Sequence, residues 1–314
     1  MNVRDLNRMV YKNEGYLYSY IYLAIEWLEP IVRKITPLPS CLDLNGKTAV
    51  VTGSSAGMGL KVARLLLKLK ISTLILAVRN VPKGGACNIG LQKFNSDARI
   101  TVLKLDMDDY ESVQTFAKGL PRGTPVVNIV SLNAGIGLLK LERSSSGHDR
   151  AIQVNYHSNI LLVAELLPHL QASAIKSGSP TRITWVGSRS HHLTNFEKKA
   201  PIKPEEVIFE HIDSEEFFFP FQRHGDSKLL CAMFMDGKSI RARPVEVGGW
   251  IILNAALVAG AESHGRFLGD KEIIEPSQYI QSLAGREVQK KLGLESIAEV
   301  VKLTPLPAEL SAQE

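Results

Sequence analysis

Apolar residues occur along the chain in short uniform runs that alternate with amphipathic stretches. From residue 48 onward the runs predict five buried strands, at 48–52, 72–78, 99–105, 126–132 and 182–186. Helical periodicity predicts helices at 60–70, 90–94, 110–118 and 148–170, the last ending near Pro168. Strands that alternate with helices in this way predict an α/β fold, with a Rossmann-like, doubly wound and mostly parallel sheet.

The second half of the chain is less regular. We expect a loop with one short helix over 190–223, and further helices over 227–235, 245–261 and 285–302. A strand over 265–273 is expected to contain a turn at Gly269-Asp270.

An aromatic and aliphatic stretch, 15–32, precedes these elements. Its uncharged part, 15–25, has about 11 residues, well short of the roughly 20 that span a bilayer. Three interpretations stay open: a helix packed on the domain, a helix at a membrane surface, and a lid or dimer contact. We therefore divide the chain into a hydrophobic extension (1–44), a Rossmann-like domain (45–302) and a flexible tail (303–314).

Composition narrows the classes of partner. The chain is 45% hydrophobic and 22% charged, which is ordinary for a globular protein and excludes wholesale disorder. The net charge of +5 is spread without a basic block, so a nucleic-acid partner is not expected. The cysteines, Cys41, Cys87 and Cys231, are far apart, and the histidines have no metal-site spacing. We expect a reducing, cytoplasmic location, with membrane association if 15–32 binds a surface, and no metal.

A glycine-rich turn follows the first predicted strand. Glycine permits a tight turn and lets backbone N–H groups approach a pyrophosphate, and the helix that begins there directs its positive end at the phosphates. The strand–turn–helix context therefore predicts a dinucleotide-binding turn. The residues expected to contact the cofactor here are Gly53, Ser55, Gly57, Met58 and Gly59.

Polar side chains end the next three strands. Arg79 follows the second strand, where an NAD-preferring site would place an acid, and it suits the 2′-phosphate of NADP. Asp106 follows the third strand and can accept a hydrogen bond from the adenine amino group. Asn133 follows the fourth strand, and two small residues after it let the backbone approach a ribose. NADP is therefore the expected cofactor, and NAD is the less favoured one.

Together these motifs resemble those of the short-chain dehydrogenases/reductases, over about 45–230 and more weakly over 245–299. The segment 52–59 is similar to the family's TGxxxGxG turn, and 133–135 is similar to its NAG motif. Asp106 resembles its adenine-contacting acid. The most similar members are retinol-dehydrogenase-like enzymes and fungal secondary-metabolism reductases.

The resemblance also implies catalytic roles. Asn155 resembles the family's helix asparagine, which holds a water of the proton relay, and Ser188 resembles the serine that positions the carbonyl. In the family a tyrosine transfers the oxygen-bound proton, and a lysine four residues later lowers the tyrosine's pKa and holds the ribose. Here Lys228 matches the lysine, but His224 stands at the tyrosine position.

No other tyrosine takes that place, because neither Tyr156 nor Tyr279 precedes a lysine by four residues. A cationic Lys228 is expected to favour the neutral ring of His224, which weakens this ring as an acid. Three interpretations stay open: an impaired or altered reductase, a non-redox or binding-only descendant, and a productive histidine relay.

The family pattern also predicts a sixth strand and a Pro-Gly turn after Met235, and neither is visible there. We therefore expect this region to be shortened, through rearranged packing or because the sequence is a shortened product. Alternatively the apolar run 251–258 supplies the strand, since short apolar runs suit a strand or a helix.

The resemblance implies an NADP-dependent oxidoreductase that acts on a carbonyl or secondary alcohol of a small molecule in secondary-metabolite biosynthesis. The Phe-rich segment 217–219 suggests that this molecule is lipophilic. The alternative is a cofactor-binding scaffold without redox activity. Expected partners are the substrate, a membrane surface contacted through 15–32, and a second copy of the chain, because oligomers are common in the family.

Overall fold

The computed structural model describes residues 38–197, 201–236, 252–260, 263, 267–269 and 272–307. Two compact units divide the chain, 1–37 and 38–314. The first unit, with the 15–32 stretch, lies outside the described residues. In the part that is described, every helix is too short or too polar to cross a bilayer.

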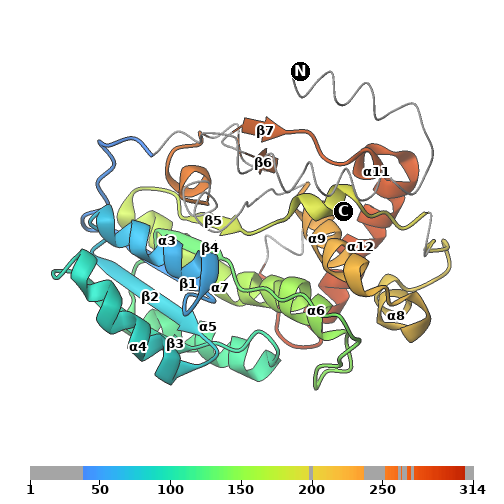
Figure 1. Cartoon of the computed structure of the whole chain (residues 1–314), viewed down its shortest axis with the longest axis horizontal. Coiled ribbons are helices and arrows are strands. Elements are labelled where there is room, and N and C mark those ends of the chain that lie inside the picture. The colour runs from blue at the N-terminus through green and yellow to red at the C-terminus, as the bar shows by residue number, and fades with distance from the viewer. Residues whose placement is uncertain are drawn as a thin grey trace. The chain divides into compact units, whose positions relative to one another are not determined.

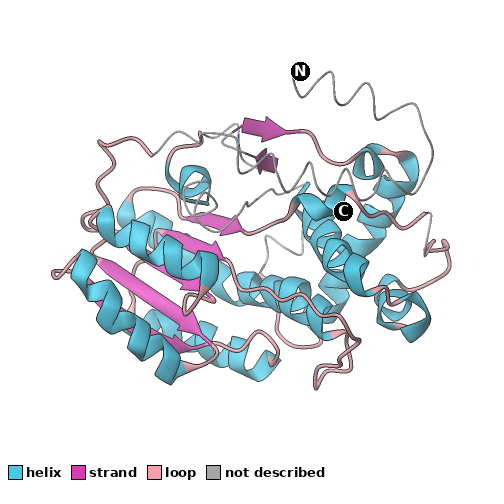
Figure 2. Ribbon diagram, viewed as in Figure 1, coloured by secondary structure: helices cyan, strands magenta, loops and turns pink. Residues whose placement is uncertain are grey.

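A five-stranded parallel sheet forms the centre of the second unit (Figures 1 and 2). The strand order is β3-β2-β1-β4-β5. From β1 the chain adds β2 and β3 on one side and then β4 and β5 on the other side, so the strand order reverses between β1 and β4. Open α/β sheets bind ligands at such a reversal, beyond the carboxyl ends of the strands. The predicted Rossmann-like sheet is confirmed. Its strands are β1 (Thr48–Thr52), β2 (Thr73–Val78), β3 (Arg99–Lys104), β4 (Ile129–Leu132) and β5 (Arg182–Trp185).

Successive side chains of the central strands point to opposite faces of the sheet. Ala49 and Val51 of β1 lie in one apolar cluster, and Val50 lies in the other. Helices α3 (Gly57–Lys68) and α4 (Val81–Leu91) contribute to the first cluster. The second cluster contains residues of α5 (Tyr110–Gly123) and α7 (Ser158–Ser177). Burial on both faces explains why the strands read as uninterrupted apolar runs.

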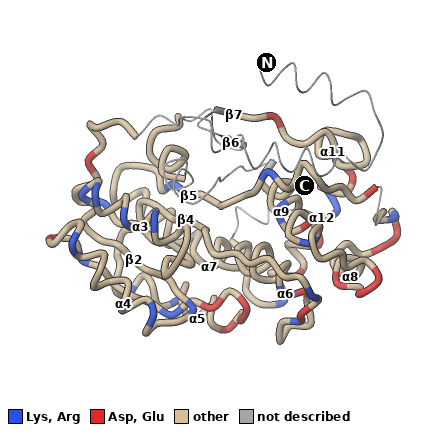
Figure 3. The backbone as a smooth tube through the Cα atoms, viewed as in Figure 1, with Lys and Arg blue, Asp and Glu red and all other residues tan. Residues whose placement is uncertain are grey.

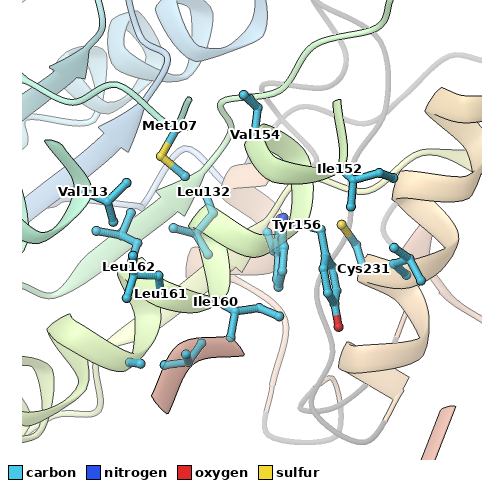
Figure 4. Packing of buried hydrophobic residues seen from close by; sticks show 14 of the residues in the cluster. Met107, Val113, Leu132, Ile152, Val154, Tyr156, Ile160, Leu161, Leu162 and Cys231 are labelled. Atoms are coloured by element: carbon cyan, nitrogen blue, oxygen red, sulfur yellow. The ribbon is translucent and has the colours of Figure 1, made fainter. Parts of the chain in front are cut away.

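Figure 4 shows part of the second cluster, where Val113 of α5 and Leu162 of α7 lie close to Leu132 of β4. Tyr156 and Cys231 lie in the same cluster. The core therefore continues from the sheet to the C-terminal helices.

Several helices differ from their predicted bounds, and α9 (Pro220–Asp236) begins seven residues before the predicted start at 227. Helix α4 begins at Val81 and not near residue 90, because the Asn80 side chain caps it by accepting a hydrogen bond from Lys83 N at 2.9 Å. A short 3₁₀-helix, η1 (Gln92–Phe94), follows it. Helix α7 continues through Pro168 to Ser177, so the predicted end near this proline is wrong. Buried residues on both sides of Pro168 keep the helix packed on the core.

The C-terminal elements are mostly helical and lie beside the sheet (Figure 1). Residues 252–257 form a helix, and Ile252 and Leu253 pack into the first cluster, so a strand over 251–258 is wrong. The predicted strand over 265–273 is instead a pair of antiparallel strands, β6 (Phe267–Gly269) and β7 (Glu272–Ile274). The helices here are α8 (Ile208–Asp213), α9 (Pro220–Asp236), α11 (Gln278–Gln281) and α12 (Leu283–Val301).

Several predicted features fall wholly or partly outside the described residues: the helix over 245–251, Asp270 in the turn, and the region directly after Met235. Within the described ranges, β5 pairs with β4 and with no second strand. Leu303 and Leu306, in the stretch predicted to be a flexible tail, pack against the second cluster.

Arg223 of α9 is the largest fully buried side chain of the described residues. Its Nε lies 3.1 Å from Asp149 Oδ2 as a close ion pair, and its Nη2 donates to Phe217 O at 2.9 Å. Its Nη1 lies 3.9 Å from Asp226 Oδ2. Asp149 also caps the short helix α6 (Arg150–Ile152). Arg223 therefore connects α9 to the start of the helix that continues into α7.

Replacing Arg223 with Met is expected to lower the free energy of unfolding by about 3–5 kcal/mol, because it leaves buried carboxylates uncompensated. Urea denaturation of the purified variant measures this loss. Lys70→Met is the control, because Lys70 forms an exposed pair with Asp43 and its loss should change little. Equal stability of the two variants would contradict a structural role for Arg223.

Candidate functional site

A cleft of about 420 Å³ lies beyond the carboxyl ends of the first four strands. This volume is in the range of small-molecule and cofactor pockets. Gly59 and Lys228 are the two predicted cofactor residues that do not line it. The predicted residues that line it are Gly53, Ser55, Gly57, Met58, Arg79, Asp106 and Asn133.

Backbone geometry requires glycine in the turn between β1 and α3. Gly53 and Gly57 have φ of +65° and +52°, in the left-handed region that favours glycine. A Cβ on Gly59 would lie 2.5 Å from Asn133 Nδ2 and 2.7 Å from Gly53 O. Gly59 therefore lies behind the cleft and lets the turn pack closely against the end of β4.

Hydrogen bonds hold this turn against the segment after β4. Thr52 Oγ1 accepts from the backbone N–H groups of Asn133 and Ala134, both at 2.9 Å, and Asn133 Nδ2 donates to Thr52 O at 2.9 Å. The predicted ribose-side segment is thus fixed to the predicted pyrophosphate turn.

The first backbone N–H groups of α3 are available to bind an anion. Its N-cap residue Ala56 makes no side-chain cap, and the first turn of α3 contains no acid. The first N–H groups of a helix have no partner within the helix. The side-chain oxygens Ser54 Oγ and Asn133 Oδ1 are buried beside this turn without a hydrogen-bond partner. These residues therefore fit a dinucleotide's phosphates and ribose.

Asn155 organises the catalytic half of the site. It lies in a buried π-helical turn, η2 (Gln153–His157), a feature frequent at functional sites. Its Oδ1 accepts from Ile136 N at 2.7 Å, and its Nδ2 donates to Ile136 O at 2.8 Å and to Ser227 Oγ at 2.9 Å. It thus joins the segment after β4 to α9.

Lys228 reaches the same place from α9. Its Nζ is buried and donates to Val186 O at 2.8 Å, at the end of β5. A Cβ on Gly135 would lie 3.6 Å from this nitrogen and 3.1 Å from Asn155 Oδ1, so the ammonium lies beside the end of the cleft. An ammonium group has three donors, so this geometry leaves donors for a ribose diol. Burial lowers the pKa of Lys228.

His224 lies with its Nδ1 3.3 Å from Ile136 O. A carbonyl oxygen only accepts, so we assign the proton of the neutral ring to Nδ1, which leaves Nε2 as an acceptor. Burial and then the Lys228 charge lower the pKa of His224. The expected neutral ring is supported, and burial adds to the effect of Lys228 that the sequence predicted.

Ser188 Oγ accepts hydrogen bonds from Ser190 N at 3.2 Å and from Ser190 Oγ at 2.8 Å. Its own proton is therefore not used in these two hydrogen bonds. The short helix that follows, η3 (Arg189–His192), packs on α9, because a Cβ on Gly225 would lie 3.2 Å from Ser190 O. Ser190 was not predicted as a neighbour of this site, although a serine such as Ser188 favours a local turn that its hydroxyl closes on the backbone N–H two residues later.

The two other tyrosines considered cannot replace His224. Tyr156 is fully buried beside Trp185, and its hydroxyl bonds Ser296 Oγ at 2.7 Å (Figure 4). Burial raises the pKa of Tyr156 well above its usual range. Tyr279 is buried in the core against Phe196, and burial raises its pKa as well.

Charged residues are distributed unevenly over the described surface. Lys and Arg are scattered over many elements, whereas Asp and Glu gather around α8 (Figure 3). In this view the Lys and Arg positions form no continuous run along the described chain.

Comparison with known proteins places the chain among enzymes. A family model described as short chain dehydrogenase matches residues 47–197. The short chain dehydrogenase macD of Penicillium terrestre is 55% identical, over 89% of this chain and 98% of its own length. The short chain dehydrogenase yanD of Aspergillus niger is 53% identical, over 87% of this chain and 97% of its own.

Among solved structures, an uncharacterised protein from Mycobacterium paratuberculosis superposes with a TM-score of 0.63. The two share 21% sequence identity, and the match covers 87% of this chain and all of that one. At this level of identity the similarity shows the fold alone.

Both curated relatives contain positions that this chain lacks. The macD alignment has 325 positions but includes 89% of the 314 residues here, about 279, so about 46 positions have no counterpart. The yanD alignment has 319 positions against 87%, about 273 residues, which again leaves about 46. These positions lie inside the alignments, in agreement with a shortened internal region.

Seven of the predicted cofactor residues line one cleft, Asn155, His224 and Lys228 lie beside its Gly135-Ile136 end, and two curated members align with most of the chain at more than half identity. The chain belongs to the short-chain dehydrogenase/reductase family of oxidoreductases.

Proposed function

We propose that this chain is an NADP-dependent oxidoreductase that acts on a carbonyl or secondary alcohol of a lipophilic small molecule. The observation that carries the proposal is the convergence of Asn155, His224 and Lys228 at the far end of the cleft. Arg79 lines the other end, where an acid would favour NAD, and it supports the choice of NADP. The Phe-rich segment 217–219 supports a lipophilic substrate, and the fungal relatives support a role in secondary-metabolite biosynthesis.

When bound, the cofactor supplies hydride-transfer chemistry at its nicotinamide ring. Ser188 orients the substrate oxygen by donating its free proton, and Lys228 holds the ribose through its remaining donors. Asn155 keeps α9 in place beside the segment after β4. His224 Nε2 takes the hydroxyl proton of an alcohol, and the protonated ring returns a proton in the opposite direction.

A second candidate function is a cofactor-binding scaffold without redox activity. Two observations favour it: His224 stands where the family has its proton-transferring tyrosine, and about 46 internal positions of the relatives are missing here. The first observation concerns the group that transfers the proton. Under this proposal the chain binds NADPH and turns nothing over.

Turnover separates the two candidates. The purified chain and a His224→Tyr variant are incubated with NADPH and a panel of aliphatic, aromatic and polycyclic ketones, and loss of NADPH absorbance is followed. Turnover by the parent chain supports the oxidoreductase and rules out the scaffold. Binding without turnover that His224→Tyr restores would rule out a productive histidine. If neither chain binds NADPH, the oxidoreductase proposal is wrong.

The pH dependence of reduction depends on the proton of His224. Because its pKa lies below the ordinary value of 6.5, the ring is neutral at neutral pH and lacks the proton that reduction needs. Reductive kcat/KM of the parent should therefore rise as pH falls and should drop about tenfold per unit above the pKa. The His224→Tyr variant should keep its reductive activity at higher pH, since tyrosine has a pKa near 10. Equal pH profiles would contradict the role of His224.

Gly59→Ala should weaken NADPH binding at least about tenfold, because the new Cβ would lie 2.7 Å from Gly53 O and open the turn that receives the pyrophosphate. Fluorescence titration with NADPH measures this. The matched control is Gly119→Ala in α5, where a Cβ meets nothing within 4 Å. That variant should keep its affinity and gain about 0.5–1 kcal/mol of stability. Equal affinities of the two variants would show that the turn does not receive the phosphates.

A further inference from the structure

The adenosine end of the cleft contains opposed charges. Arg79 and Asp106 both line it. A carboxylate suits the adenine amino group, but it repels the dianionic 2′-phosphate that Arg79 would attract. Asp108 is already compensated, because its Oδ2 lies 2.6 Å from Arg150 Nε. Asp106 is therefore the acid that opposes a 2′-phosphate here.

Lys104 contacts both Arg79 and Asp106. It is the last residue of β3 and lies opposite Val78 in the register with β2. Its Nζ donates to Arg79 O at 2.8 Å and lies 3.5 Å from Asp106 Oδ2. One ammonium thus holds the backbone that carries Arg79 and faces the carboxylate of Asp106.

The charge balance of this end depends on Lys104. Without it, the positive charge of Arg79 and the negative charge of Asp106 cancel, and a dianionic phosphate meets no net attraction. With it, one positive charge remains. The Lys104 and Asp106 side chains are 54% and 22% exposed, so solvent screens the pair and the effect on binding is modest.

We propose that Lys104 is a positioning residue for cofactor choice, which favours a 2′-phosphorylated dinucleotide by neutralising Asp106 and holding the backbone of Arg79. It acts through these residues, not by contact with the phosphate. This inference rests on the proposed NADP preference and adds to Arg79 a second determinant on the neighbouring strand.

The test uses two small probes that occupy only the adenosine half, 2′,5′-ADP and 5′-AMP, so it does not depend on the catalytic half. Calorimetric titration gives their affinities for the full chain. The variants are Lys104→Gln, Asp106→Asn, the double variant and Lys104→Arg. Lys70→Gln is the matched control, because Lys70 also pairs with an exposed aspartate, Asp43, at 3.2 Å.

Lys104→Gln is expected to weaken 2′,5′-ADP about threefold, while 5′-AMP stays within about twofold of the parent. The loss should be larger at low salt. Lys104→Arg should keep the parent's preference for 2′,5′-ADP over 5′-AMP, and Lys70→Gln should leave both affinities unchanged. In the Asp106→Asn background, Lys104→Gln should have less than half its effect, because the carboxylate that it compensates is gone.

Four outcomes overturn the inference. An equal loss for both probes indicates a merely structural role. An undiminished loss in the Asp106→Asn background indicates direct contact with the phosphate. If Lys104→Gln leaves both affinities unchanged, in a parent that prefers 2′,5′-ADP, the role of Lys104 is overturned but the NADP proposal stays intact. A parent that binds both probes equally, or neither, overturns the NADP proposal and this inference together.

Discussion

The carbonyl oxygen of Ile136 accepts hydrogen bonds from Asn155 Nδ2 at 2.8 Å and from His224 Nδ1 at 3.3 Å. A carbonyl has two lone pairs, so these two donors use its full capacity. The geometry of the catalytic half depends on this one acceptor, because it lies at the end of the cleft and ties η2 and α9 to it. Asn155 also bonds Ile136 N and Ser227 Oγ, which fixes α9 from a second direction.

The hydrogen bond to Ile136 O also determines which nitrogen of His224 is left as an acceptor. A tyrosine hydroxyl donates or accepts with one atom, whereas an imidazole divides these tasks between two nitrogens. Because Nδ1 is directed at a carbonyl, Nε2 of the neutral ring is left as an acceptor, and burial beside Lys228 keeps the ring neutral. Under the proposed function, a histidine at this position favours removal of a proton from an alcohol over delivery of a proton to a ketone.

The sequence predicted the features that arise from local pattern. The five strands and the turn at 53–59 follow from apolar runs and glycine spacing, and most of the turn's neighbours in the cleft follow from the ends of those strands. The predicted length of α4 was too short, because glycines weaken its helical pattern. The predicted length of α7 was also too short, because Pro168 suggests a helix end although packing keeps the helix continuous. The roles of Lys104 and Arg223 were not predicted, because they come from contacts between segments far apart in the chain.

The two halves of the site are built from different parts of the sheet. The pyrophosphate turn and the adenosine end lie on β1 to β4, of which β1, β2 and β4 pair on both sides and β3 is an edge strand that pairs with β2. The nicotinamide end rests on β5, whose one partner in the described sheet is β4, and on the chain beyond it. Helices cover both faces of a parallel sheet, but an edge strand has one side without a partner strand, so a shortened region after α9 would affect the β5 end of the sheet. Adenosine affinity and hydride transfer are therefore separable properties of this chain. The proposed adenosine contacts lie within the described residues, whereas the proposed catalytic half depends on the bonds by which Asn155 and Lys228 hold α9 in place.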